Sequence, residues 1–122
     1  MVPPEDPRPD AADQPIAFRP AEQAFTPMRP GVDGATVETR DLTVTTYRYA
    51  AGAVWQEHAH PEDQLTMLLS GAEVRFTVGG RGFVLHPGDA LLIPGGTVHS
   101  AVVGDQDVVT LNVWRLRSIL PT

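Results

Sequence analysis

The stretch that decides the fold and the chemistry of this chain reads Glu57-His58-Ala59-His60-Pro61-Glu62-Asp63-Gln64. Side chains alternate between the two faces of a strand, so His58 and His60 would project from the same face of an extended segment. Pro61 cannot donate to a strand ladder and predicts a turn. After that turn Gln64 can offer its amide oxygen from a returning strand, so that two imidazoles and one amide face a single point.

A second stretch, Pro94-Gly95-Gly96-Thr97-Val98-His99, supplies a third histidine. A Pro-Gly-Gly run favours a tight reversal, so the residues after it are expected to re-enter the sheet beside the first strand. A single histidine is more often a core or surface residue than a ligand, but imidazole is the commonest metal-ligand side chain. His58, His60, Gln64 and His99 are therefore candidate ligands of one divalent ion of iron, manganese, nickel or zinc, a prediction that gains its weight from the frames in which the two stretches sit.

Both stretches sit in frames of glycines. Gly52 and Gly71 flank the first stretch, and Gly88 precedes the second. Together they resemble the two sequence motifs of the cupins. The chain departs from the cupin pattern in two places, with Gln64 where the first motif usually carries Glu and Val102 where the second usually carries Asn. The first motif looks like that of small cupins that act in pectin degradation on unsaturated uronates, and of related polyketide cyclases.

Strand-forming residues dominate the chain after residue 34. Short runs rich in Val, Thr, Tyr, Phe, Leu and Ile alternate with Gly, Pro and Asp turns, which indicates an all-β sandwich or barrel. We expect strands at 35–39, 42–49, 65–69, 74–78, 83–85, 90–93, 100–103 and 108–114. No helix is predicted beyond a short turn at residues 116–120. The resemblance implies an RmlC-like cupin architecture, a double-stranded β-helix or jelly-roll barrel.

The beginning of the chain has a different composition, since eight of its 12 prolines fall within the first 30 residues. We predict two regions, a proline-rich tail and arm at residues 1–34 and a cupin barrel at residues 35–122. Residues 1–14 are expected to be disordered. Residues 15–34 are expected to form an arm that lies on the barrel or on a partner subunit, with a lid over the site as the alternative. A homodimer is predicted from this arm.

Composition excludes several classes of function. The formal charge is -6, lysine and cysteine are absent, and the nine arginines are scattered. Schiff-base and thiol chemistry are therefore excluded, and nucleic acid is not an expected partner. No apolar run approaches the roughly 20 residues that span a bilayer, and no signal peptide is recognised, so we expect a cytoplasmic protein that does not act at a membrane.

The pocket can be predicted only by strand parity. Counting from the histidines, Gln56, Thr66 and Leu68 should also point inward and line the pocket. Arg48 and Arg75 are further candidates for binding the small-molecule substrate, because a guanidinium suits an anionic group. The acids Glu57, Glu62 and Asp63 are expected at the surface, Trp55, Met67 and Trp114 in the core or a dimer interface, and His86 in a structural role. The sequence assigns no catalytic base.

By resemblance, the leading hypothesis is an enzyme in which the divalent ion acts as a Lewis acid on a small carbonyl or enol substrate, in an isomerase, cyclase or lyase reaction. One alternative is a non-haem iron dioxygenase with the same ligands. The other is a non-catalytic module that binds a small ligand in the barrel.

Overall fold

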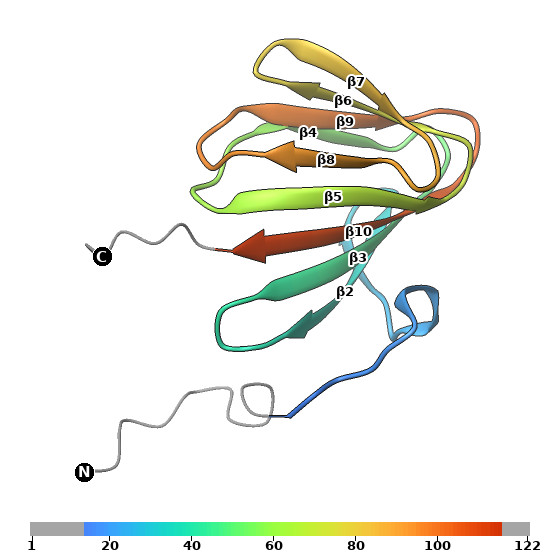
Figure 1. The fold of residues 1–122 in the computed structure, drawn as a ribbon. Coiled ribbons are helices and arrows are strands. Elements are labelled where there is room, and N and C mark those ends of the chain that lie inside the picture. The colour runs from blue at the N-terminus through green and yellow to red at the C-terminus, as the bar shows by residue number, and fades with distance from the viewer. Residues whose placement is uncertain (1–13, 116–122) are drawn as a thin grey trace, which may run out of the picture.

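The strand pattern of the sequence produces a two-sheet β structure (Figure 1). The computed structural model describes residues 14–115. Besides one 3-10 turn, η1 (Pro20–Glu22), the regular elements of these residues are all strands. The strands are β1 (Thr26–Arg29), β2 (Val32–Glu38), β3 (Thr43–Tyr49), β4 (Val54–His58), β5 (Asp63–Ser70), β6 (Val74–Val78), β7 (Arg81–Leu85), β8 (Ala90–Ile93), β9 (His99–Val103) and β10 (Val108–Arg115).

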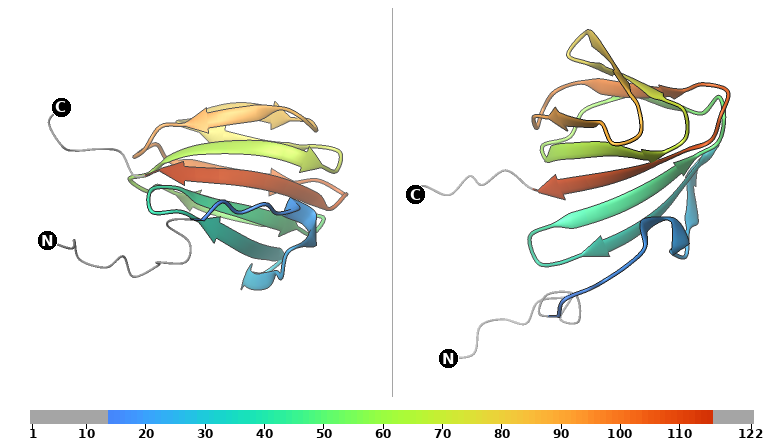
Figure 2. Two further views of the ribbon diagram at one scale, coloured as in Figure 1. Left: turned by 60° about the horizontal axis from the view of Figure 1, so that its bottom comes forward. Right: turned by 45° about the vertical axis from the view of Figure 1, so that its right-hand side comes forward.

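All strand pairs among the described residues are antiparallel and belong to two sheets. The larger sheet has the order β1-β2-β3-β10-β5-β8, and the smaller one has the order β4-β9-β6-β7. Figure 2 shows β5, β10 and β3 lying side by side in the larger sheet. Many neighbours in these orders are distant in sequence, as in a jelly roll. The predicted all-β cupin jelly-roll fold is confirmed.

The core lies between the two sheets. Leu68 on β5 and Ile93 on β8 come from the larger sheet, and Val74 and Phe76 on β6 come from the smaller one. Burial alternates along β6, where Val74, Phe76 and Val78 are buried and the residues between them are exposed. Alternate residues therefore fill the space between the sheets, and the others face outward.

The first strands begin earlier than the sequence suggested. β1 and the first three residues of β2 lie within residues 26–34, inside the predicted arm, and they extend the larger sheet beyond β3. The disorder predicted for residues 1–14 falls outside the described residues except at residue 14, and the turn predicted at 116–120 falls outside them entirely. Within residues 14–115, no helix is long and apolar enough to span a membrane.

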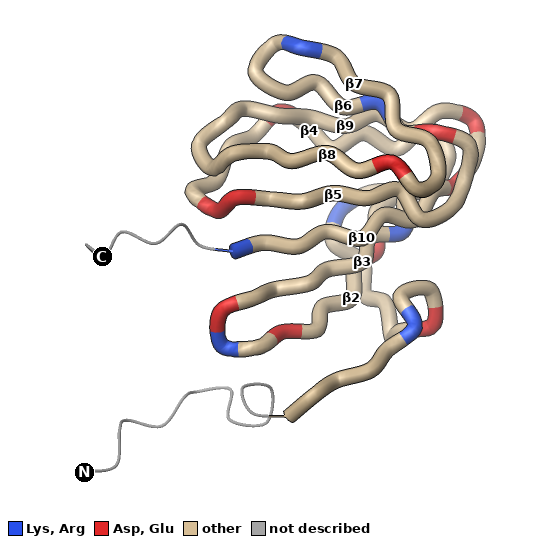
Figure 3. Tube along the Cα trace, in the orientation of Figure 1, with Lys and Arg blue, Asp and Glu red and all other residues tan. Residues whose placement is uncertain are grey.

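Charged residues are mixed over the surface. Figure 3 shows arginines on separate elements, with acidic residues concentrated at the turns between strands. Several arginines have a carboxylate neighbour, for example Arg48 with Asp33 at 3.3 Å and Arg75 with Glu73 at 3.1 Å. The described surface therefore interleaves the two signs of charge.

Candidate metal centre

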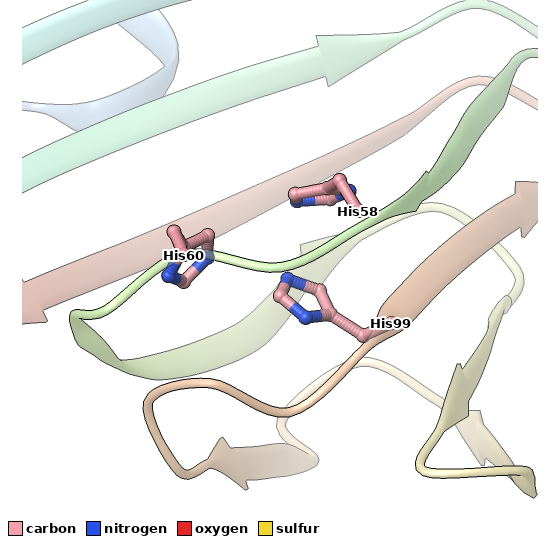
Figure 4. Close-up of side chains that lie close together, drawn as sticks. All are labelled: His58, His60 and His99. Atoms are coloured by element: carbon pink, nitrogen blue, oxygen red, sulfur yellow. The ribbon is translucent and has the colours of Figure 1, made fainter.

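Three histidines meet inside one end of the barrel (Figure 4). His58 is the last residue of β4 and His99 the first residue of β9, and the two are register partners. Their ring centroids are 4.2 Å apart, and the His60 ring lies 4.9 Å from that of His99 and 5.6 Å from that of His58. One nitrogen from each ring lies within 4.8 Å of the other two. The three imidazoles predicted from the two motifs are therefore brought together.

The geometry differs from the simple strand expectation. His60 lies in the connection after β4 rather than on the strand, and the β4–β9 register shifts between Trp55 and His58. Such a bulge breaks the alternation of side chains. Gln56, which parity placed inward, is consequently exposed.

The Pro-Gly-Gly turn is fastened directly to the loop that carries His60. The Gly96 amide donates to the His60 carbonyl at 2.8 Å, and the Gly95 amide donates to Asp63 Oδ1 at 2.7 Å. A Cβ on Gly95 would strike the carbonyl oxygen of Pro61, so no larger residue fits without moving backbone. This close approach fixes the start of β9 and thereby the position of His99, as the turn residues predicted.

Each histidine has its protonation pattern fixed by a backbone carbonyl. The Nδ1 atoms of His58, His60 and His99 lie 2.8, 3.0 and 2.8 Å from carbonyl oxygens of Gln56, Glu62 and Thr97, respectively. A carbonyl only accepts hydrogen bonds, so each Nδ1 carries a proton, which leaves Nε2 as the ring nitrogen that can bind a metal ion when the imidazole is neutral. The Nε2 of His99 is buried and has no hydrogen-bond partner in the described structure.

Gln64 adds a fourth acceptor, and a buried network orients it. Its Nε2 donates to Thr66 Oγ1 at 2.8 Å and to Asn112 Oδ1 at 3.2 Å. Asn112 cannot turn around, because its Nδ2 donates to the backbone carbonyl of Thr45 at 3.3 Å. The amide oxygen of Gln64 is left facing His60, with Oε1 and Nε2 2.9 Å apart.

Two acceptors at that distance repel each other unless a positive charge lies between or beside them. With neutral rings, the lone pairs of three Nε2 atoms and the Gln64 oxygen share one small region without a donor. Burial, together with the neighbouring His58 and His60, lowers the pKa of His99 below its ordinary value, although the carbonyl of Thr97 opposes this. A lowered pKa favours the neutral ring that a metal ion needs. These nitrogen and oxygen atoms are therefore suitable ligands for a divalent ion.

The cluster opens into a cavity of about 500 Å³. Aromatic rings form much of its wall: Trp55 packs 5.9 Å from His58 and 4.7 Å from Tyr47, centroid to centroid. The other side chains at its wall include those of Arg29, Arg40, Asp41, Tyr49, Glu62, Phe76 and Trp114. Trp55 and Trp114, which were expected in the core or a dimer interface, line this cavity. Arg29 was not predicted here, because only the pairing of β1 with β2 brings that residue to the cavity.

The four residues predicted to bind substrate lie elsewhere. Thr66 and Leu68 point inward as parity predicted, but both are fully buried and lie beneath the cavity wall rather than on it. Arg48 is exposed, paired with Asp33 and stacked 3.9 Å over the ring of Phe25. Arg75 is also exposed and is paired with a glutamate. The positions of the two arginines argue against contacts with a substrate in the cavity, because both lie on outward faces of their strands.

The acids of the first motif are divided between surface and cavity. Glu57 is exposed, and Asp63 serves the hydrogen bond to the Gly95 turn, both as expected. Glu62 differs from the prediction, since it lines the cavity and its carboxylate lies 3.6 Å from the Nδ1 of His60. His86 lies outside the cavity, exposed and beside acidic side chains.

An antiparallel barrel of two sheets surrounds histidines from β4, from the loop after it and from β9. This combination of fold and site places the chain in a class of small β-barrel proteins. The cupin domain family matches residues 45–114, more than half of the chain, and the chain belongs to that family. No curated protein sequence matches it significantly.

Solved structures share the fold over most of the chain. KdgF from Halomonas sp. is 26% identical, with a TM-score of 0.77 over 87% of this chain and 97% of that one. An RmlC-like cupin from Shewanella frigidimarina is 18% identical, with a TM-score of 0.77 over 89% and 96%. The DMSP lyase DddQ from Ruegeria pomeroyi is 22% identical, with a TM-score of 0.68 over 84% of this chain and 59% of that one. The chain is thus a cupin, and a lyase is among the proteins that share its fold.

Proposed function

We propose that the protein is a metal-dependent cupin enzyme of the isomerase, cyclase or lyase type, which binds one divalent ion through His58, His60, Gln64 and His99. The observation that carries this proposal is the convergence of three imidazoles, with one nitrogen of each within 4.8 Å of the others, beside the Gln64 amide oxygen, together with the buried and unpartnered Nε2 of His99. When bound, the ion would supply Lewis-acid polarisation of a carbonyl or enol oxygen of a small substrate. All four ligands are neutral, so they leave the charge of the ion uncompensated.

The surrounding side chains prepare the cavity for this chemistry. Trp55, Phe76 and Trp114 present apolar surface that displaces water from a bound substrate, which strengthens electrostatic interactions there. Burial raises the pKa of Tyr47 to about 12, with partial opposition from Arg29, so its hydroxyl stays protonated and acts as a hydrogen-bond donor. Glu62 places a carboxylate beside the Nδ1 of His60, where it supports the orientation and basicity of that ring.

Metal analysis of the purified protein tests the proposal. Elemental analysis of protein prepared without added metal, followed by titration with zinc, nickel, manganese and iron, should give about one ion per chain, because the three rings define one site. His99→Ala should lose most of that ion. His86→Ala is the matched control, since His86 is exposed and outside the cavity, and it should keep the ion. Equal metal content in all three proteins would refute the site.

The chemical class is tested with the loaded protein and a panel of small carbonyl compounds. Turnover without oxygen, with zinc or nickel bound, supports the Lewis-acid reaction. Substrate-dependent oxygen consumption with bound iron would replace it by the dioxygenase alternative. Binding with every compound returned unchanged would support the non-catalytic module instead.

The predicted homodimer is kept as a proposal. Apolar side chains are exposed in neighbouring positions on the outer face of the smaller sheet, where Val54 on β4 pairs with Val102 on β9. Light scattering during size-exclusion chromatography should show a dimer for the full chain, and Val102→Glu, which places a charge on this exposed face, should shift it to the monomer. A monomeric full-length chain would refute the dimer.

A further inference from the structure

Arg29 brings a positive charge to the cavity from an element outside both motifs. It is the last residue of β1, and its guanidinium carbon lies 4.0 Å from the centroid of the Trp55 ring. Among residues 14–115, no carboxylate pairs with it, whereas Arg48 and Arg75 each have one within 3.3 Å. Arg29 therefore keeps its five N–H donors for another partner.

The guanidinium of Arg29 and the histidine cluster lie on the wall of the same cavity. The Trp55 ring that it covers also lies 5.9 Å from the His58 ring, and both Arg29 and His58 line the same cavity. The two acids on the cavity wall are placed elsewhere. Glu62 adjoins His60, and Asp41 follows β2 at the end opposite to β1. A ligand lying along Trp55 would thus have the cation at one end and the imidazoles at the other.

A hydrogen-bond donor accompanies the cation. The charge of Arg29 acts on the phenol of Tyr47, which is 7% exposed and lines the cavity. No hydrogen bond of this hydroxyl is formed within the described part of the chain. A guanidinium, a phenol hydroxyl and an aromatic platform together make a site for a planar anion, because charge-assisted hydrogen bonds from Arg to a carboxylate are strong and can be bidentate.

We propose that Arg29, with Tyr47, binds the carboxylate of the substrate, and that the substrate is a small oxo acid or enol acid whose carbonyl or enol oxygen reaches the histidine cluster. The assignment of the oxygen end rests on the proposed metal-dependent function. The assignment of the carboxylate end rests on Arg29 and Tyr47 and can be tested without metal.

The first test compares acids with neutral analogues on the unchanged protein. Pyruvate, acetoacetate and 4-oxopentanoate are titrated beside their methyl esters, with and without bound nickel, and binding is followed by the fluorescence of Trp55 and Trp114, the two tryptophans of the chain. At least one acid should bind about ten- to a hundredfold more tightly than its ester, the usual effect of a hydrogen bond to a charged group. Rising salt should reduce the difference. Equal binding of acids and esters, or no binding of any acid, overturns the proposal.

The second test changes the cation. Arg29→Gln should remove the preference for the acid, and Arg29→Lys should retain part of it because it keeps the charge but not the fork of donors. Arg81→Gln is the matched control, since Arg81 also lies over an aromatic ring, 5.3 Å from that of Phe83, but is exposed on β7 and outside the cavity. An unchanged preference in Arg29→Gln overturns the proposal.

The two proposals fail in different ways. Because Arg29 is exposed and binds no metal, Arg29→Gln should keep the metal content and melting temperature of the parent protein, which also shows that the variant is folded. A parent protein that takes up no metal but still prefers acids would refute the metal-dependent function and leave the carboxylate site standing. Metal uptake with no preference for acids would refute the carboxylate site and leave the metal-dependent function standing.

Discussion

Gln64→Glu is the most informative single substitution, because it tests whether the chain is built for a neutral ligand. The change restores the residue that the cupin pattern usually carries at this position. Here the Gln64 side chain is 7% exposed, and its Nε2 donates to both Thr66 and Asn112. A carboxylate oxygen in place of that nitrogen would face Asn112 Oδ1 at about the 3.2 Å now occupied by a hydrogen bond.

The expected loss of stability follows from those contacts. Thr66 can rotate its hydroxyl toward the new carboxylate, but Asn112 Oδ1 then loses both of its donors in a residue that is 2% exposed. A buried acceptor without a partner costs about 1–3 kcal/mol, and more beside a charge. We expect the metal-free variant to lose about 2–4 kcal/mol in free energy of unfolding, which lowers the melting temperature by roughly 10–20 °C in a domain of this size.

The pH dependence of that loss has a definite sign. When the introduced carboxyl is protonated, it regains a donor for Asn112, so the folded state should raise the pKa of this carboxyl above its unfolded value of about 4.3. The folded variant then binds the proton more tightly than the unfolded chain does. Its stability deficit should consequently be small near pH 4 and should grow as pH rises.

Urea unfolding of metal-free Gln64→Glu and parent protein between pH 4 and pH 8 measures this directly. Gln106→Glu, the same chemical change at an exposed loop position, is the control and should stay close to the parent. Bound metal should stabilise Gln64→Glu more than the parent, because a carboxylate ligand offsets the charge of the ion. A metal-free variant as stable as the parent at pH 8 would refute the orienting role of Asn112.

Three further results are expected. Gly95→Ala should cost about 1–3 kcal/mol and weaken metal binding, because its Cβ meets the Pro61 carbonyl, whereas Gly82→Ala, with open space, should not; equal melting curves would contradict this. The chain has two tyrosines, and absorbance should show no phenolate from either at pH 10, since burial raises both pKa values, that of Tyr47 to about 12. Formation of phenolate near pH 10 would contradict their burial. Metal-free protein should lose stability as pH falls below about 6.5, because the lowered pKa of His99 lets the unfolded chain bind the proton first, and His99→Gln should remove part of this slope.

The sequence predicted those features that depend on local spacing. The alternation of strand residues indicated the all-β fold, and the two glycine frames indicated the cupin family and the three histidines. The Pro-Gly-Gly turn was correctly expected to deliver His99, because a tight reversal is encoded by the residues that form it. Parity correctly turned Thr66 and Leu68 inward, since β5 is regular over those positions.

Parity failed where the strand is irregular or where a wall is built by distant residues. The bulge in β4 turned Gln56 outward, and the pairing of β1 with β2 brought Arg29 to the cavity. The orientation of Gln64 depends on Asn112, 48 residues away, which lies beside it only because β10 pairs with both β3 and β5. Local sequence determines which way a strand presents its side chains, but the partners that they meet are decided by the pairing and closure of two sheets, which brings together residues that no local pattern relates.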